Sequence, residues 1–474
     1  MVLTVRAALV AVFVLAFANL QADPTIVTSP GLQMRVGTWS VLPAGTDEWD
    51  VDLSVAFDND NSSSFRAWWH VEVADLNPAV AETFNFDITG SQFPGDYITP
   101  VWSLDGGATY ERIPGLQGPF NFTVTVPAGI SSFRIAKYYP YTLPEYEAFK
   151  ASVETHPYVT VTTSTQTTTL GNKLYLFEIT DPGVSNAGKK RVWIHSAVHP
   201  SENTAHFTTE GLIDFLLSGS TEAELILDEL IFDIVPVANP DGIERGNYRT
   251  NADSINLEVQ WASPYNPGIP ENEFMIEKIE EFMGTSGSPG ANPIELLLNL
   301  HATHGNEPPY HFVHNANYNI NGTGVIPEVR ALEDAWVTAI RNRNAYVDDG
   351  SDHFSSLSGR VYVESMMHDR YSLDSTWNDI MAITLEGVYQ IGPDPGIPNT
   401  PDDYRQMGED MGLAIADYFG VDLTASGINA WMLLEANALD AAAPAGDVWP
   451  PMVTLANRCA PFEHGRRGFV LVRR

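Results

Sequence analysis

Cysteine is nearly absent from this chain. Cys459 is the single cysteine among 474 residues, so an intramolecular disulfide cannot form. A protein without disulfide bonds has to draw its stability from the packing of its core.

Basic residues are also scarce. The chain has 25 Lys and Arg residues against 60 Asp and Glu residues, which gives a formal net charge of -35 at pH 7. A surface of this sign repels nucleic acids and anionic membrane surfaces. We therefore expect neither as a partner, and acidic polymers are poor substrates unless a cleft is locally basic.

Long apolar runs are confined to the N-terminus. Arg6 is followed by an apolar stretch over residues 7–18 that is too short to cross a bilayer comfortably. This pattern is typical of a secretory signal peptide, here over residues 1–22, with cleavage after Ala18 or Ala22. No later segment is long and apolar enough to span a membrane. The sequence therefore predicts a secreted or periplasmic protein without an integral membrane segment once the signal is removed.

A chain of this length is expected to form two or three domains. In residues 23–140, short runs of alternating apolar and polar residues are broken by Gly, Pro, Asn and Asp, as at 49–57, 67–73 and 120–126. Such alternation with turn residues predicts an all-β sandwich. The region gathers no histidines or paired carboxylates in a catalytic arrangement, so we expect a supporting or recognition module.

The pattern changes over residues 141–422, where nearly continuous apolar strands alternate with longer amphipathic stretches. Strand and helix in alternation predict an α/β layer fold. Residues 423–474 are Ala-rich and then basic, and are expected to form a disordered or poorly packed tail. We expect strands at 174–179, 191–197, 230–237, 296–300 and 381–385, and helices at 203–217, 221–229, 327–343 and 401–419.

A histidine and a glutamate lie three residues apart directly after one apolar strand. They are His199 and Glu202, in the run His199-Pro-Ser-Glu202. The strand holds one side chain while the following turn brings the other round, so both can point at one divalent ion, and zinc accepts these ligands. The alternative is a histidine that caps a strand and a solvated glutamate at the start of a helix.

Two further strand ends carry polar residues of the same kind. The run 295–300 is followed by His301, with His304 three residues on, and the run 381–385 is followed by Glu386. Ligands of open α/β sheets collect outside the carboxyl ends of strands, which favours His301 over the loop residue His304 as third ligand. A glutamate beside a metal-activated water can take its proton, as a hydrolase requires.

An arginine follows the turn-forming run Asn239-Pro-Asp-Gly242. Arg249, in Gly-Asn-Tyr-Arg249, can supply the fixed cation that stabilises a tetrahedral oxyanion. Alternatively it is a surface arginine that satisfies loop carbonyl groups.

Together these residues resemble the zinc carboxypeptidase (M14) family over residues 143–420. The resemblance implies a mixed-sheet catalytic domain with one zinc ion, bound by His199, Glu202 and His301. It implies that Glu386 is the general base, that Arg249 stabilises the transition state, and that Tyr371 is the nearest match to the family's mobile tyrosine. The β-rich region before Leu143 resembles the domain that precedes the catalytic unit in cytosolic-carboxypeptidase-like members.

The chain departs from the family where substrate is held. The usual Asp-Leu-Asn-Arg-x-Trp is replaced by Asn256-Leu-Glu258-Val259-Gln-Trp261. A glutamate repels a free C-terminus and a valine donates no hydrogen bond. Either another arginine substitutes, or the substrate carries an amide, amine or basic group there.

The sequence therefore favours a secreted zinc metallocarboxypeptidase acting on a peptide or protein. Two alternatives remain open: an amidohydrolase or deacylase of the same fold whose substrate lacks a free C-terminal carboxylate, and a catalytically inactive binding protein. Retention of the ligands, the base and the arginine counts against the inactive protein, because buried polar clusters are costly.

Overall fold

The computed structural model describes residues 23–424, apart from residue 97 and the segments 116–117, 263–264, 267, 304–309, 314–324, 349–360 and 390–397. The described elements fall in one compact unit that ends at Leu423. The predicted signal peptide and nearly all of the predicted tail lie outside the described residues. Within the described part of the chain, no helix combines the length and the apolar character that crossing a membrane requires.

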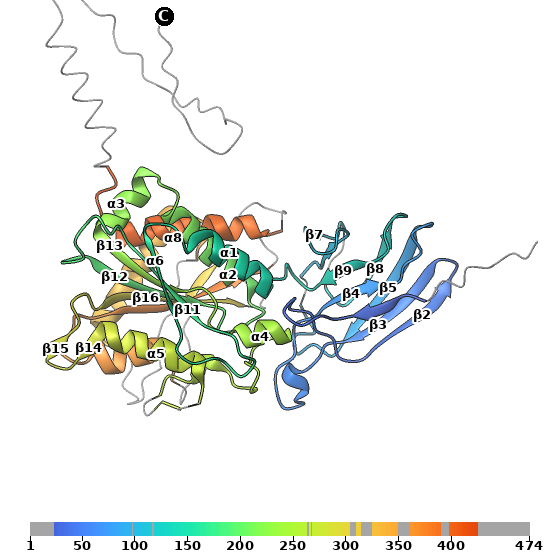
Figure 1. The fold of residues 1–474 in the computed structure, drawn as a ribbon, viewed down its shortest axis with the longest axis horizontal. Helices are drawn as coiled ribbons and strands as arrows, with labels where there is room; N and C mark the ends of the chain where they lie inside the picture. Colours follow the sequence, from blue (N-terminus) through green and yellow to red (C-terminus); the bar gives the residue numbers. More distant parts are fainter. Residues whose placement is uncertain are drawn as a thin grey trace, which may run out of the picture. The chain divides into compact units, whose positions relative to one another are not determined.

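Two sheets form the N-terminal region (Figure 1). One has the strand order β1 (Thr25–Val27), β4 (His70–Ala74), β9 (Phe133–Ala136), β6 (Val101–Ser103) and β7 (Glu111–Arg112). The other has the order β2 (Trp39–Gly45), β3 (Glu48–Ser54), β5 (Glu82–Thr89) and β8 (Asn121–Val126).

Period-two alternation in these strands explains why the two sheets share a core. In β5 and β8 every second residue is buried, which places Phe84, Phe86 and Phe122 on the inner face. The rings of Phe84 in one sheet and Phe133 in the other lie 5.2 Å apart between centroids. The predicted all-β N-terminal region is confirmed, and its two sheets pack as a sandwich.

The second part of the chain is built on a mixed seven-stranded sheet. Its order is β10 (Val159–Thr163), β11 (Tyr175–Ile179), β13 (Leu230–Val235), β12 (Lys190–Ser196), β16 (Ile294–Thr303), β18 (Met381–Val388) and β17 (His311–Val313). The central strands β13, β12, β16 and β18 run parallel, and the others pair antiparallel. This arrangement confirms the predicted α/β class with a mixed sheet.

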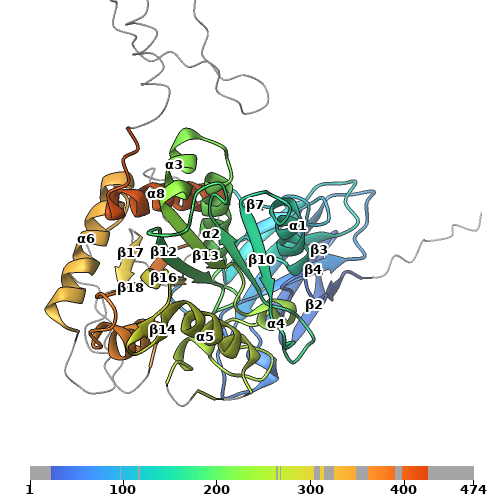
Figure 2. The ribbon, with the colours of Figure 1, turned by 60° about the vertical axis from the view of Figure 1, so that its left-hand side comes forward.

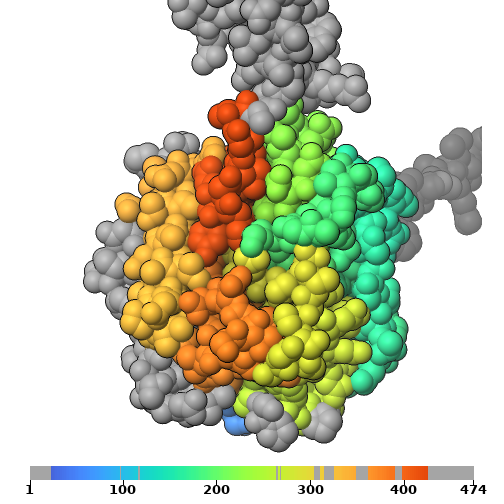
Figure 3. All heavy atoms as spheres, turned by 90° about the vertical axis from the view of Figure 1, so that its left-hand side faces the viewer, coloured from blue at the N-terminus to red at the C-terminus, as the bar shows by residue number. Residues whose placement is uncertain are grey.

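Helices cover both faces of this sheet (Figures 1 and 2). Val192 and Ile194 of β12 join one buried core and Trp193, between them, joins the other, so the strand is apolar on both faces. Helix α5 (Pro270–Met283) covers one face. On the other face lie α2 (Asn203–Leu216), α3 (Thr221–Glu229), α6 (Pro327–Arg343) and α8 (Pro401–Phe419), and Figure 3 shows α6 and α8 side by side.

Several elements have other bounds than the sequence predicted. Strands β16 and β18 continue past His301 and Glu386, to Thr303 and Val388, because their backbone pairing continues there. The remaining elements are α1 (Leu143–Val153), α4 (Pro240–Arg245), α7 (Val363–Met367), the short helices η1 (Asp58–Asp60), η2 (Leu257–Val259) and η3 (His368–Ser372), and the hairpin β14 (Gly284–Thr285) and β15 (Ser288–Pro289).

Helices α2 and α8 approach each other closely because glycine stands at their contact. A Cβ atom on Gly408 would lie 2.1 Å from the carbonyl oxygen of Thr208, and one on Gly211 would lie 2.1 Å from that of Arg405. These obstacles are backbone atoms, which cannot rotate away. The close packing holds α2, whose first turn follows Glu202.

We expect Gly408→Ala to lower the free energy of unfolding by about 1–3 kcal/mol, because an added methyl group has no room between the helices. Urea denaturation of the full chain measures this. Gly95→Ala is the matched control, since a Cβ there meets nothing within 4 Å, and it should change stability by less than about 0.5 kcal/mol. Equal stability of the two variants would contradict the close contact.

Candidate metal centre and active site

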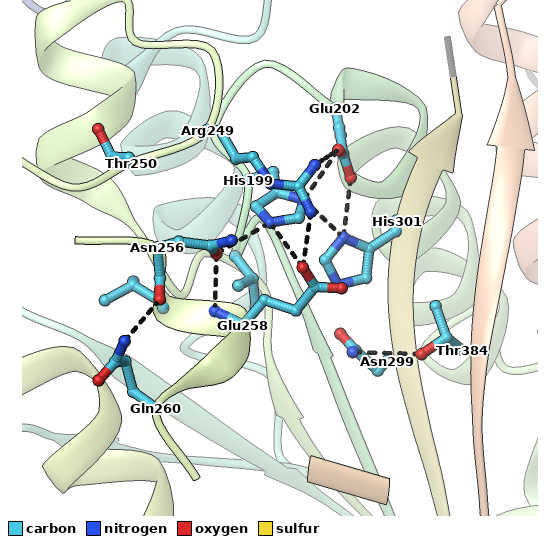
Figure 4. Close-up of polar contacts among 12 residues, drawn as sticks. His199, Glu202, Arg249, Thr250, Asn256, Glu258, Gln260, Asn299, His301 and Thr384 are labelled. Atoms are coloured by element: carbon cyan, nitrogen blue, oxygen red, sulfur yellow. Dashed lines mark hydrogen bonds and ion pairs between the residues drawn. The ribbon is translucent and has the colours of Figure 1, made fainter. Parts of the chain in front are cut away.

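Two histidines and a glutamate meet where β12 gives way to α2 (Figure 4). After β12 the chain turns through Ala197, at φ 60, and reaches His199. Glu202 is the N-cap residue of α2. Its Oε1 lies 2.8 Å from Nδ1 of His199, and its Oε2 lies 2.8 Å from Nδ1 of His301. Residues 99 positions apart in the sequence are thus brought into contact by the pairing of β12 with β16.

The donor atoms face one another in a way that suits a cation. The Nδ1 atoms of His199 and His301 are 3.0 Å apart, and both face the Glu202 carboxylate. The three side chains are at most 4% exposed. Two imidazole nitrogens of the same kind directed at one buried carboxylate form the nitrogen and oxygen donor set that zinc prefers. The residues present therefore fit a zinc ion.

Charge interactions dominate the ionisation of this group. Burial raises the pKa of Glu202, but the charges of His199 and His301 and their hydrogen bonds outweigh it, and the net pKa lies well below the ordinary value. For His199, burial and Arg249 lower the pKa, while Glu202 and Glu258 raise it more, so the net direction is upward. The centre is thus organised to hold positive charge beside Glu202.

Glu258 adds a second carboxylate to this centre. Its Oε2 lies 2.7 Å from Nη2 of Arg249 and 3.2 Å from Nε2 of His199. The Oδ1 atom of Asn256 also lies 3.2 Å from Nε2 of His199. One donor atom each from His199, Glu258 and His301 lies within 4.8 Å of the others. Glu202 contacts Nδ1 of both histidines, whereas Glu258 contacts the opposite nitrogen of His199.

The contacts of Glu258 also govern its charge. Burial raises its pKa. The positive charges of His199, His301 and Arg249 lower it by more than burial raises it, so that the net pKa lies well below its usual range. The carboxylate is therefore charged at neutral pH and already engaged by Arg249 and His199. Glu258 therefore differs from an unpaired carboxylate at the edge of a pocket, which would be free to contact substrate.

Glu386 lies on the neighbouring strand, opposite His301 in the parallel register of β16 and β18. Burial and the negative charges of Glu202 and Glu258 raise its pKa, His301 and Arg249 lower it, and the net pKa is about 8. Glu386 shares a pocket with His199 and Glu202. A carboxyl group with a raised pKa in such a pocket is suited to accepting and returning a proton.

The pocket itself has a volume of about 350 Å³. The residues that line it come from both parts of the chain, because Phe93 belongs to the N-terminal region. Arg249 provides the positive charge of the lining. The lining residues are Phe93, His199, Glu202, Tyr248, Arg249, Ala302, Thr303 and Glu386.

The segment that leads to Arg249 begins with helix α4, which starts at the turn-forming run Asn239-Pro-Asp-Gly242. Asn239 caps α4 by accepting a hydrogen bond from the Gly242 amide at 2.9 Å, and donates to the carbonyl of Val198 at 3.1 Å. Gly246 ends the helix in the left-handed region, at φ 65. The Asn-Pro-Asp-Gly run therefore caps a helix and tethers the turn that leads to His199.

The other candidate residues have different surroundings. Val259 ends η2 and is partly exposed. Tyr371 is 0% exposed and packs its ring at 4.9 Å from that of Trp377, within the core on the α5 side of the sheet. It is not among the residues that line the pocket. His304 lies outside the described residues.

Three residues that shape this site were not among the site residues predicted from the sequence. Asp58 and Phe93 belong to the N-terminal region, which has no catalytic pattern, and only the tertiary contact brings them to Arg249 and the pocket. Asn256 belongs to the motif that departs from the family pattern, but the sequence does not predict its hydrogen bond to His199, which depends on the path of the loop.

Comparison with known proteins shows what this chain is similar to. Residues 146–304 match the zinc carboxypeptidase family, Peptidase M14. The chain is 34% identical over 163 residues to cytosolic carboxypeptidase 2 of Macaca fascicularis, which covers 32% of this chain and 19% of that protein. A longer match to cytosolic carboxypeptidase 6 of Mus musculus, 23% identical over 400 residues, covers 78% of this chain and 70% of that protein. The chain spans about a fifth of the length of the curated relatives it matches first.

Solved structures share the fold. A metallo-carboxypeptidase from Burkholderia cenocepacia superimposes with a TM-score of 0.67 at 20% identity, covering 84% of this chain and 99% of that one. A metallo-carboxypeptidase from Pseudomonas aeruginosa, in complex with (2-guanidinoethylmercapto)succinic acid, gives the same TM-score, identity and coverage. The resemblance to zinc carboxypeptidases predicted from the sequence is confirmed.

The prediction of a secreted or periplasmic protein is wrong. The homologous proteins are named cytosolic carboxypeptidases, which contradicts export. The prediction rested on one basic residue and an apolar run, a pattern of composition that a segment can show without acting as a signal.

Proposed function

We propose that this protein removes residues from the C-terminus of a peptide or protein in a zinc-dependent hydrolysis, because its residues 146–304 match the zinc carboxypeptidase (M14) family. The observation that carries the proposal is the meeting of His199, Glu202 and His301 at 2.8–3.0 Å. Glu386 and Arg249 share their pocket.

We assign zinc binding to Nδ1 of His199, Nδ1 of His301 and the carboxylate of Glu202. When bound, zinc supplies a Lewis acid that polarises the scissile carbonyl and lowers the pKa of water. Glu258 does not bind the zinc in this assignment but contacts one of its ligands, because its Oε2 lies 3.2 Å from Nε2 of His199. A carboxylate on the second nitrogen of a ligand histidine fixes the orientation of the ring and makes it a stronger donor.

Glu386 takes the part of the proton carrier. Its carboxylate accepts the proton of the attacking water and later donates it to the leaving amine nitrogen. Its position beside His301 in register supports this role, since both side chains belong to paired strands. Burial, which raises its pKa, favours uptake of the proton from the attacking water.

Arg249 takes the part of the oxyanion donor. Its Nη2 is held by Glu258 at 2.7 Å, and its side chain is 24% exposed and reaches the pocket. A guanidinium fixed before the reaction stabilises the negative charge that develops on the carbonyl oxygen without reorganisation. The ion pair with Glu258 is what fixes it.

Paired peptides test the proposed reaction. The purified full chain should contain one zinc ion and release the last residue of a peptide with a free C-terminus, with the amidated form of the same peptide cleaved at least ~10-fold more slowly. Quantitative amino-acid release and elemental analysis measure both. Equal rates on the two peptides would refute carboxypeptidase action.

A His199→Ala variant tests the metal assignment directly. It should lose stoichiometric zinc, because one of three donors disappears from a site that requires at least three. His156→Ala is the matched control, since His156 follows α1 and its Nδ1 bonds the amide of Tyr158. Zinc retained in full by His199→Ala would remove this residue from the site.

A further inference from the structure

One carboxylate of the N-terminal sandwich holds the backbone of the Arg249 segment. Oδ1 of Asp58 accepts a hydrogen bond from the amide of Tyr248 at 2.7 Å. Oδ2 accepts from the amide of Arg249 at 2.9 Å, the amide of Thr250 at 2.8 Å and the hydroxyl of Thr250 at 3.0 Å. Three consecutive residues, with Arg249 at their centre, are therefore fixed by a single side chain.

Asp58 is committed to this contact. The residue is 1% exposed, and burying a carboxylate is costly unless hydrogen bonds satisfy it. Burial raises its pKa more than the bonds from Tyr248, Arg249 and Thr250 lower it, so the net direction is upward. Bonds from amides to a charged acceptor are stronger than neutral ones. The contact thus has the strength to define the backbone position of Arg249.

The neighbouring residue reinforces the same junction. Asn59 donates from Nδ2 to the carbonyl of Asn251 at 2.7 Å, and accepts at Oδ1 from Nδ2 of Asn247 at 3.0 Å. Asn59 and Asp60 adopt positive φ angles of 51 and 57. Two successive residues other than glycine in this region carry strain, which the bonds to residues 247–251 offset.

Aromatic side chains of the sandwich flank the same segment. The Phe65 ring lies 5.4 Å from Cζ of Arg249, in cation-π geometry. Phe65 and Phe93 pack edge-on against Tyr248, at 6.2 and 5.9 Å between centroids. The sandwich therefore contacts both the backbone and the guanidinium of the Arg249 segment.

We propose that Asp58 is a positioning residue that holds Arg249 in the place required for catalysis. The N-terminal sandwich then contributes a residue on which the active site depends. The proposal rests on the oxyanion role given to Arg249 in the proposed function. Asp58 acts through the backbone of residues 248–250, and Glu258 acts on the guanidinium. Without Asp58 or without Glu258, Arg249 is still present but is displaced from the carbonyl oxygen on which negative charge develops.

A double-mutant cycle on the full chain tests this. Arg249→Ala should lower kcat by about 10²–10³-fold, as loss of an oxyanion donor does. Asp58→Asn should lower kcat by about tenfold or more with zinc content unchanged, because a displacement of about 1 Å is costly. In the Arg249→Ala background, Asp58→Asn should change kcat less than about twofold, since both act through one group.

Hydrogen exchange provides a readout that does not depend on turnover. The amides of residues 248–250 should exchange faster in Asp58→Asn and remain protected in Asp60→Asn, the matched control. Asp60 lies in the same turn but is 83% exposed and bonded to Arg35. If Asp58→Asn does not fold, Thr250→Val takes its place. This variant removes one of the four hydrogen bonds to Asp58 and should also lower kcat.

The outcomes separate this proposal from the proposed function. Unchanged protection of residues 248–250 in Asp58→Asn, or the same loss of kcat with and without Arg249, would overturn the positioning role alone. Full activity of Arg249→Ala would overturn the oxyanion role and the positioning role together. Full kcat and protection in Thr250→Val would also count against Asp58.

Discussion

A Glu386→Gln variant is expected to keep its zinc and its fold and to lose hydrolysis by about 10²–10⁴-fold. Glutamine has nearly the same volume, so it fills the same place in β18 beside His301, but its amide cannot accept and return a proton. Steady-state kinetics on a peptide with a free C-terminus, together with zinc analysis of the same sample, measures the two effects separately.

The control for this variant is Glu295→Gln. Glu295 is the second residue of the neighbouring strand β16 and pairs with Lys190 at 2.7 Å, a partly exposed ion pair that contributes little to stability. It should retain full activity and full zinc. A Glu386→Gln enzyme that turns over at the rate of the parent would exclude Glu386 as the proton carrier.

A Glu258→Gln variant is expected to bind zinc about 10–100-fold more weakly, as loss of a carboxylate behind a ligand histidine does. Glutamine keeps the shape but withdraws the negative charge from Nε2 of His199 and from Arg249. Competition with a chromophoric chelator measures the affinity. Asp253→Asn is the control, because this exposed carboxylate of the same loop bonds Thr169, away from the histidines.

The same substitution should shift the pH profile. Glu258 is among the charges that raise the pKa of Glu386, so its removal lowers that pKa. Glu386 must be ionised to accept a proton, and activity is therefore lost as pH falls through its pKa. The acid limb of kcat/KM should move to lower pH in Glu258→Gln. A limb that moves to higher pH, or zinc affinity equal to that of the parent, would contradict this account of Glu258.

Much of the fold was predictable because its signals are local. Helices α3, α6 and α8 have the predicted bounds, since amphipathic periodicity and the residues at a helix start, Ser220 before α3 and proline in α6 and α8, are read from neighbouring residues. Strands β16 and β18 extend further than predicted, because a strand ends where its partners stop pairing. Helix α5 was not predicted, although it covers one face of the sheet.

The sequence by itself determined which family this protein resembles and which residue types form the candidate site. His199 and Glu202 lie at one strand-to-helix junction, so their contact follows from local geometry, and the glutamate after the run 381–385 marks a second strand with a candidate catalytic residue. These residue types, in this order, were enough to indicate a zinc hydrolase.

Only the tertiary structure decided which residues complete the site. Strand order places His301 and Glu386 side by side across 85 positions, and the loop path turns Glu258 onto Arg249 and His199. Asp58 reaches Arg249 from 191 positions away. Contacts of this kind depend on which surfaces the packed sheets present to each other, which no local pattern of apolar and polar residues encodes.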